Sequence, residues 1–158
     1  MLNVAIHGMG NWGRKLIDSC AGSSKIKFVC GITRNPDTHK DYATKAGIKL
    51  VTSYEAVLAD KSIDAVVANA GFGARRGFLA ESPEFWKSMV LTNVYGAAIT
   101  LRACIPALTE SRGHAVLMGS ISGRQVGTGS LYSCTKWAVT AMAEAARKEL
   151  LGSGVRVT

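Results

Sequence analysis

The chain lacks the cysteine spacings of disulfide-bonded and metal-binding proteins, and its N-terminal apolar run is short. Its four cysteines show neither CxxC nor metal-ligand spacing, which predicts reduced thiols, a cytoplasmic location and no metal site. The apolar run after Met1 is too short for a signal peptide or a membrane span. There is no internal repeat and no low-complexity linker. The sequence therefore predicts a single globular domain over residues 1–158, with no membrane partner.

Acidic residues are scarce beside basic ones. The chain has 19 Lys and Arg against 11 Asp and Glu, a net charge of +8. A nucleic-acid-binding protein would gather these charges on one segment with aromatic residues between them, but here they are spread along the chain. We therefore predict a solvated basic surface and no nucleic-acid partner, with some of the charge available to an anionic cofactor.

A glycine-rich loop stands near the start of the chain. The apolar run at 2–7 reads as a buried strand, and the GxGxxG pattern of Gly8, Gly10 and Gly13 follows it directly, before helical spacing at 14–20. The first glycine allows a tight turn, the second lets backbone approach a pyrophosphate, and the third allows close packing of strand and helix. With Asn11 and Trp12 between them, these residues predict a dinucleotide-binding loop.

The end of the second predicted strand bears on the choice of dinucleotide. A chain that prefers NAD places Asp or Glu there for the ribose hydroxyls, whereas this strand ends in Thr33 and Arg34. A guanidinium can pair with a 2′-phosphate, so we favour NADP over NAD. An ordinary surface arginine is the alternative interpretation of Arg34. The next carboxylate, Asp37, lies beyond Pro36 and is expected to begin a helix.

Strand and helix patterns alternate through the whole chain. This alternation predicts an α/β protein with a three-layer α/β/α Rossmann fold, a doubly wound parallel sheet of about six strands in the order 3-2-1-4-5-6. Helices are expected at 36–46, 54–59, 82–110 and 131–151, and the later strands at 25–33, 48–52, 63–71, 113–120 and 155–158.

Tyr132 and Lys136 lie four residues apart at the start of the last predicted helix, so both side chains share one face. An ammonium beside a phenol favours the phenolate, as a tyrosine acid or base requires near neutral pH. On most helices such a pair is only a surface pair. Ser120, upstream across a glycine-rich loop, is placed to hold a substrate oxygen beside the tyrosine.

Residues 68–158 resemble the short-chain dehydrogenase/reductase family. Asn69, Ala70 and Gly71 are similar to the end of its NNAG motif, with Ala68 in place of the first Asn. The order and spacing of four residues match its catalytic tetrad: Asn93, Ser120, Tyr132 and Lys136. The resemblance implies that Tyr132 is the general acid or base, that Ser120 orients the substrate oxygen, that Lys136 holds the nicotinamide ribose, and that Asn93 supports a water relay.

Residues 1–67 resemble a different family, the N-terminal domain of the glucose-fructose oxidoreductase/inositol dehydrogenase family. The similarity rests on VAIHGMGNWG, on TRNP, where Thr33 replaces the usual Asp, and on TSYEAVLAD followed by KSIDAVV. Short-chain dehydrogenases carry GxxxGxG rather than GxGxxG. We therefore expect a hybrid with a seam near 64–71, either a natural fusion or an engineered recombination.

The resemblances imply an NADP(H)-dependent oxidoreductase that interconverts a carbonyl and an alcohol in a small-molecule substrate. Because the short-chain family continues past VRVT with a segment that covers the substrate, we also consider a chimera that binds a dinucleotide without turnover, or one that only folds. In the short-chain family the two long helices build oligomer interfaces, which implies a homo-oligomer here.

Overall fold

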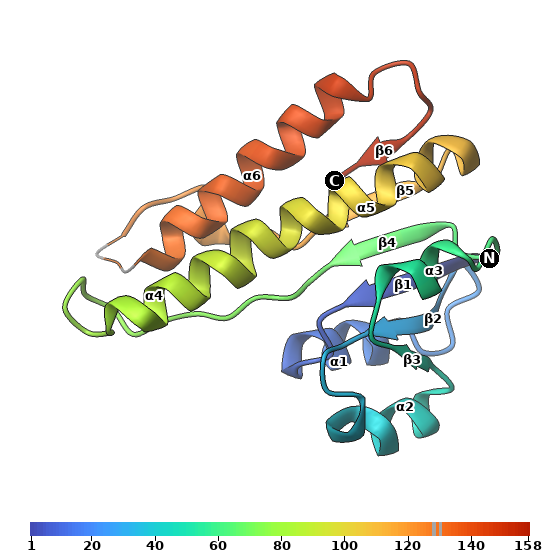
Figure 1. The fold of residues 1–158 in the computed structure, drawn as a ribbon, viewed down its shortest axis with the longest axis horizontal. Coiled ribbons are helices and arrows are strands. Elements are labelled where there is room, and N and C mark those ends of the chain that lie inside the picture. The colour runs from blue at the N-terminus through green and yellow to red at the C-terminus, as the bar shows by residue number, and fades with distance from the viewer. Residues whose placement is uncertain (128, 130) are drawn as a thin grey trace.

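The computed structural model describes residues 1–127, 129 and 131–158, and among them six parallel strands form one sheet. The order is β3-β2-β1-β4-β5-β6, which confirms the predicted doubly wound α/β arrangement. Two helices cover one face of the sheet and three cover the other (Figure 1). The strands are β1 (Leu2–His7), β2 (Ile26–Ile32), β3 (Lys49–Val51), β4 (Ala65–Ala68), β5 (His114–Leu117) and β6 (Arg156–Val157).

Alternate residues of the central strands supply two separate cores. Val4 and Ile6 of β1 pack with Ile17 on the face that carries α1 (Asn11–Ser19) and α2 (Lys40–Ala46). Ala5 points to the other face, which is covered by α3 (Tyr54–Leu58), α5 (Gly96–Ser111) and α6 (Leu131–Glu149). Strands buried on both faces read as continuous apolar runs, which is why these strands were visible in the sequence.

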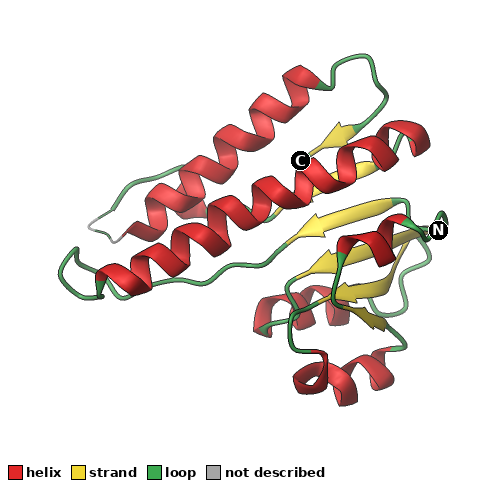
Figure 2. Ribbon diagram, in the orientation of Figure 1, coloured by secondary structure: helices red, strands yellow, loops and turns green. Residues whose placement is uncertain are grey.

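The helix predicted at 82–110 is three consecutive segments. After α4 (Pro83–Val90) a π-helical turn spans Leu91–Tyr95, and α5 continues from Gly96. The combined helix runs beside α6 and projects beyond the carboxyl ends of the strands (Figure 2). By length and apolar composition alone, Pro83–Ser111 could cross a membrane, a test that core helices also pass.

The remaining differences from the expected elements are local. The helix expected at 36–46 begins as a 3₁₀ turn, Pro36–His39, before α2 follows with Gly47 as its left-handed cap. Gly47 has φ +66°, a conformation that glycine adopts without strain. β4 ends at Ala68, so Asn69, Ala70 and Gly71 lie on the loop beyond the strand rather than in it.

Candidate active site

The glycine loop after β1 meets the loop after β4 at the carboxyl edge of the sheet. Gly8 has φ +103°, and a side chain there would come within 2.6 Å of the Ala70 backbone. The Asn69 side chain donates from Nδ2 to the Gly8 carbonyl at 2.8 Å. At Gly13 a Cβ would overlap that same carbonyl oxygen, whereas at Gly10 it would meet open space. Gly8 and Gly13 therefore serve packing, and Gly10 faces the space where a ligand could approach.

The first turn of α1 is free to bind an anion. Its cap residue, Gly10, supplies no side-chain hydrogen bond, and its first turn contains no acidic residue. Unpaired N–H groups and the helix dipole favour a phosphate at such an end. Asn11 and Trp12 are exposed there, and the Lys15 ammonium lies 4.7 Å from the centre of the Trp12 ring.

A buried acceptor next to this loop lacks a partner. The side chain of Asn69 is 8% exposed, and its Oδ1 atom accepts no hydrogen bond from the described residues. Buried polar atoms are usually paired, so an unpaired one beside a glycine cradle indicates a missing donor. That acceptor is closed off from solvent, so the fit to a dinucleotide rests on the open space at Gly10 and on the acid-free first turn of α1.

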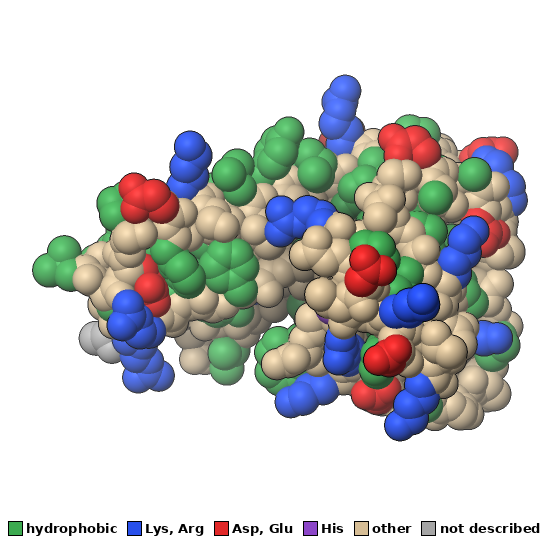
Figure 3. Space-filling view, turned by 60° about the horizontal axis from the view of Figure 1, so that its bottom comes forward, with side chains coloured by type: hydrophobic (Ala, Val, Ile, Leu, Met, Phe, Trp, Pro, Cys, Tyr) green, Lys and Arg blue, Asp and Glu red, His purple; other side chains and the backbone are tan. Residues whose placement is uncertain are grey.

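A cavity of about 490 Å³ extends from the glycine loop to the end of β2. Its lining includes Gly8, Ala70 and Arg34, and none of its lining residues is acidic. Figure 3 shows the molecular surface hollowed between the projecting end of the long helices and the rest of the molecule. A cavity at the point where strand order reverses is where doubly wound folds bind their ligands.

Two arginines lie at the β2 end. Arg34 is exposed at the cavity, after the buried Thr33, whose Oγ1 accepts from the Asn35 backbone N–H at 3.3 Å. Arg14 of α1 contacts His39 Nδ1 at 2.9 Å and donates to the Thr38 carbonyl at 3.2 Å. The sequence analysis did not single out Arg14, because only the fold brings α1 to the 3₁₀ turn.

The π-helical turn brings Asn93 to the base of α6. Asn93 is 2% exposed. Its Oδ1 accepts a hydrogen bond from the Phe72 N–H at 3.0 Å. Its Nδ2 donates to the Phe72 carbonyl at 2.9 Å and to Thr135 Oγ1 at 3.1 Å. A π-turn inside an α-helix is frequent at functional sites. In this structure the Asn93 amide ties the β4 loop to α6 one residue before Lys136.

Lys136 is a buried cation at the end of β5. Its side chain is 6% exposed, and its Nζ donates to the Met118 carbonyl at 2.6 Å. Burial lowers the pKa of Lys136 from its ordinary value, because desolvation penalises the charged form. The same ammonium lies 5.9 Å from the centre of the Tyr132 ring, so the two residues share one face of α6 as the spacing predicted.

Ser120 and Tyr132 stand on either side of the loop between β5 and α6. Ser120 is half-buried, and its Oγ accepts from the Ser122 N–H at 3.2 Å, which caps the short 3₁₀ turn Ile121–Gly123. Tyr132 is half-buried in the first turn of α6. The four predicted tetrad residues thus come from three elements that meet at the carboxyl edge of the sheet, on the same edge as the glycine loop.

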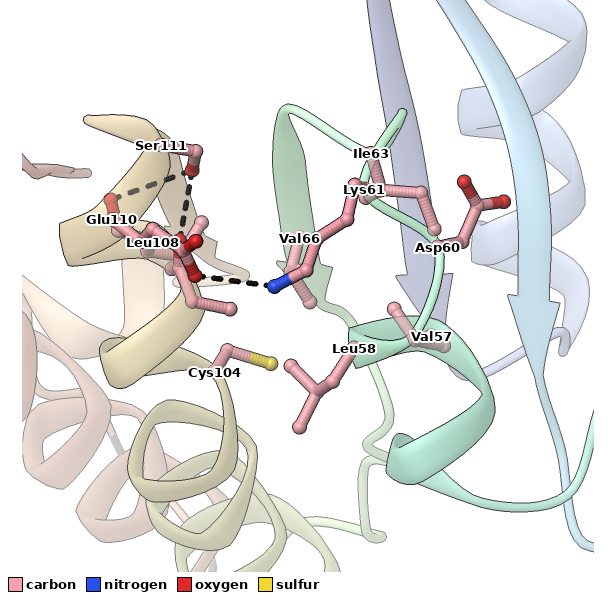
Figure 4. Close-up of a pocket in the computed structure, with 11 residues that line it drawn as sticks. Val57, Leu58, Asp60, Lys61, Ile63, Val66, Cys104, Leu108, Glu110 and Ser111 are labelled. Atoms are coloured by element: carbon pink, nitrogen blue, oxygen red, sulfur yellow. Dashed lines mark hydrogen bonds and ion pairs between the residues drawn. The ribbon is translucent and has the colours of Figure 1, made fainter.

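A second, smaller cavity lies between α3 and α5, toward the amino ends of the strands. Its volume is about 310 Å³, and its lining includes Val57, Leu58 and Cys104 (Figure 4). Lys61 and Glu110 pair across its rim at 3.1 Å. Burial raises the pKa of the Cys104 thiol to about 11, which makes it unreactive. None of the predicted site residues lines this cavity, and the described residues contain no group of three or more ligands that could hold a metal ion.

Comparisons with known proteins identify the family and the fold of the chain. The family model for short chain dehydrogenases matches residues 21–158. An uncharacterized oxidoreductase of Staphylococcus saprophyticus is 31% identical over 95% of this chain and 67% of its own length. The crystal structure of Escherichia coli serine dehydrogenase has a TM-score of 0.79 at 23% identity, covering 99% of this chain and 80% of that one.

The chain also superposes on the crystal structure of 3-ketoacyl-(acyl-carrier-protein) reductase from Brucella melitensis, which is complexed with NADH. The TM-score is 0.77 at 21% identity, and the match covers 99% of this chain and 73% of that one. At these identities the structures show a shared fold. The chain spans about two thirds of the length of the Staphylococcus saprophyticus relative.

The hybrid expected from the sequence finds no support in these comparisons. One family model runs without a break from residue 21 through the expected seam at 64–71 to residue 158. Nothing in the comparisons shows a segment of the glucose-fructose oxidoreductase family in residues 1–67 or a chimeric origin. The chain belongs to the short-chain dehydrogenase family.

Proposed function

We propose that this chain is an NADP(H)-dependent oxidoreductase domain that interconverts a carbonyl and an alcohol, with Tyr132 as the general acid or base. The observation that carries the proposal is the placement of Tyr132 and the buried Lys136 on one face of α6, at the sheet edge that also holds the glycine cradle. A bound reduced nicotinamide supplies the hydride, and the protein supplies position, electrostatics and the proton.

In the reducing direction, the substrate carbonyl carbon gains the hydride while its oxygen takes a proton from the Tyr132 hydroxyl. Ser120 donates a hydrogen bond to that oxygen and holds it near the phenol. Lys136, fixed by its bond to the Met118 carbonyl, stabilises the phenolate that remains. Solvent then returns a proton to Tyr132, which restores the starting state, and the oxidising direction reverses each of these steps.

The preference for NADP over NAD is supported by charge. Arg34 borders the cavity, and none of the cavity's lining residues carries a carboxylate. Arg14 lies outside the cavity lining and donates to the Thr38 carbonyl in the nearby 3₁₀ turn. A 2′-phosphate would therefore find the Arg34 guanidinium and no acidic group in the cavity. The cysteine spacing supports a cytoplasmic location, and the family supports a small-molecule substrate.

The exposed apolar residues of the long helices support a homo-oligomer. Val90, Leu91 and Tyr95 on the α4–α5 helix are 38%, 50% and 58% exposed, and Trp137 of α6 is 44% exposed. Light scattering coupled to gel filtration should give a mass of at least two chains of 16.7 kDa. A monomeric mass at micromolar concentration would contradict this part of the proposal.

The function is tested by Tyr132→Phe, which removes the hydroxyl and keeps the ring. We expect NADPH oxidation with a panel of ketones and aldehydes to fall by about 10²–10⁴-fold, since a positioned acid–base group contributes that much. NADPH binding, measured by calorimetry, should change little. Equal rates in wild type and variant would contradict the role of Tyr132, and saturable NADPH binding without any turnover would indicate a binding module instead.

A further inference from the structure

His7, the last residue of β1, is the one titratable side chain of this mostly apolar strand. It lies immediately before Gly8 and is half-buried, with its ring packed edge-to-face against Tyr54 at 5.5 Å between centres. His7 Nδ1 lies 2.8 Å from the Tyr54 hydroxyl. The Tyr54 hydroxyl lies 2.6 Å from Thr100 Oγ1, and the Thr100 hydroxyl lies 2.7 Å from the Gly96 carbonyl.

These three short contacts determine where the protons are. The Gly96 carbonyl can only accept, so the single proton of the Thr100 hydroxyl is donated to it. Thr100 Oγ1 must then accept the Tyr54 proton, and the Tyr54 oxygen must accept a proton from His7 Nδ1. If Thr100 instead donated to Tyr54 and Tyr54 to His7 Nδ1, the Thr100 and Gly96 oxygens would face each other at 2.7 Å without a proton between them.

His7 therefore carries a proton on Nδ1. Burial, helped by the charge of Arg34, lowers the pKa of His7 from 6.5, which favours the neutral imidazole with that proton as its only one. Its Nε2 atom then carries a lone pair. Nε2 has no hydrogen-bond partner among the described residues and is not among their fully buried atoms, so ligands can reach it.

The accessible side of His7 lines the cavity that extends from the glycine loop to Arg34. Gly8, Ala70 and Arg34 line the same cavity, so a dinucleotide with its pyrophosphate at the glycine loop would place its adenosine ribose and base against this lining. We infer that His7 Nε2 accepts a hydrogen bond from a donor on the adenosine half of the bound cofactor, either the 6-amino group or a ribose hydroxyl. Tyr54 and Thr100 act as positioning residues that hold the imidazole in the accepting tautomer. This inference rests on the proposed dinucleotide binding.

Two amide substitutions separate the two nitrogens of His7. The amide of His7→Asn reaches the Nδ1 position and leaves the Nε2 position empty, whereas the longer His7→Gln reaches the Nε2 position. We expect His7→Asn to raise the dissociation constant of NADPH about fivefold to tenfold, as for the loss of one hydrogen bond. His7→Gln should keep more of the affinity, and both are measured by calorimetry with unfolding temperatures as the control for folding.

The nicotinamide hypoxanthine dinucleotide phosphate distinguishes the two donors, because it lacks the 6-amino group. If that group is the donor, the effect of His7→Asn disappears with this analogue; if a ribose hydroxyl is the donor, the effect persists. An unchanged affinity of His7→Asn for both dinucleotides would overturn the inference.

The tautomer is read independently from long-range ¹H–¹⁵N spectra of histidine-labelled protein. We expect Nδ1 protonated and Nε2 unprotonated before ligand is added, and a change in the Nε2 shift on titration with NADPH. A proton on Nε2 in the free protein would overturn the inference. So would NADPH binding that leaves the Nε2 shift unchanged, a result that would leave the proposed function intact. Absence of saturable NADPH binding would contradict the proposed function itself, and this inference with it.

Discussion

Lys136 is a buried cation whose position lowers the stability of the fold. An ammonium with a 6% exposed side chain loses most of its hydration, and its one hydrogen bond to the Met118 carbonyl returns only part of that free energy. Buried ionisable groups whose pKa is shifted gather at functional sites. The sequence predicted the position of Lys136 on the Tyr132 face of α6, but its depth could not be read from a spacing.

The residues that sequence reasoning missed are those whose partners are remote in the chain. His7 contacts Tyr54 and Thr100, which lie 47 and 93 positions away. The signal available was a histidine at the end of a mostly apolar strand. Its consequence could not be predicted, because periodicity places a residue on a face without naming what stands opposite.

The histidines give the stability of the protein a defined pH dependence. The pKa values of His7, His39 and His114 are all lowered from 6.5, in each case mainly by burial. As the pH falls below 6.5, the unfolded chain takes up protons that the folded chain does not, so the free energy of unfolding decreases.

Urea unfolding at pH 7.5 and 5.5 measures this effect, and we expect a lower midpoint at pH 5.5. His7→Asn, which cannot titrate, should show a smaller decrease than the wild type. A midpoint that stays constant or rises between pH 7.5 and 5.5 would contradict the assignment of neutral, buried histidines.

At the scale of elements, the two cores explain why the strands and their order were predictable. A parallel strand buried on both faces is apolar throughout, and alternation with helices then admits few topologies. The boundaries of the long helix were also close to those predicted. What could not be seen was the π-turn at Leu91–Tyr95, because the extra residue is favoured by the contacts of Asn93 with Phe72 and Thr135 rather than by local preference.

The glycine loop allows packing and ligand binding to be separated by two matched substitutions. Gly8→Ala places a methyl group against Ala70 at a backbone φ of +103°, so it should lower the free energy of unfolding by about 1–3 kcal/mol. Gly10 has φ −67° and open space at its Cβ position, so Gly10→Ala should leave stability within about 0.5 kcal/mol.

In Gly10→Ala, however, the new methyl group stands where the pyrophosphate would approach, so NADPH binding should weaken. Urea unfolding and calorimetry on both variants check the pair. If Gly10→Ala bound NADPH as tightly as the wild type, the placement of the pyrophosphate at this loop would be wrong.

On the scale of the whole molecule, the glycine cradle, the arginines at the β2 end and the tetrad residues lie along one edge of a single sheet. The parallel topology explains this arrangement, because it brings the carboxyl ends of all six strands together. Residues 1–67 and 68–158 were expected to come from two families. The family match runs across the expected seam at 64–71, and nothing in the comparisons shows a second family.

The most direct test is a thermal-unfolding titration with NADPH and, in parallel, NADH. A ligand at a hundred times its dissociation constant adds about 2.7 kcal/mol, which raises the unfolding temperature of a domain of this size by roughly 5–10 °C. We predict a larger shift with NADPH than with NADH at equal concentration. Arg34→Gln should remove most of this difference between the two dinucleotides. The control variant Arg102→Gln, on the exposed side of α5, should leave the difference unchanged. No shift with either dinucleotide would contradict the proposal that this sheet edge is a working cofactor site.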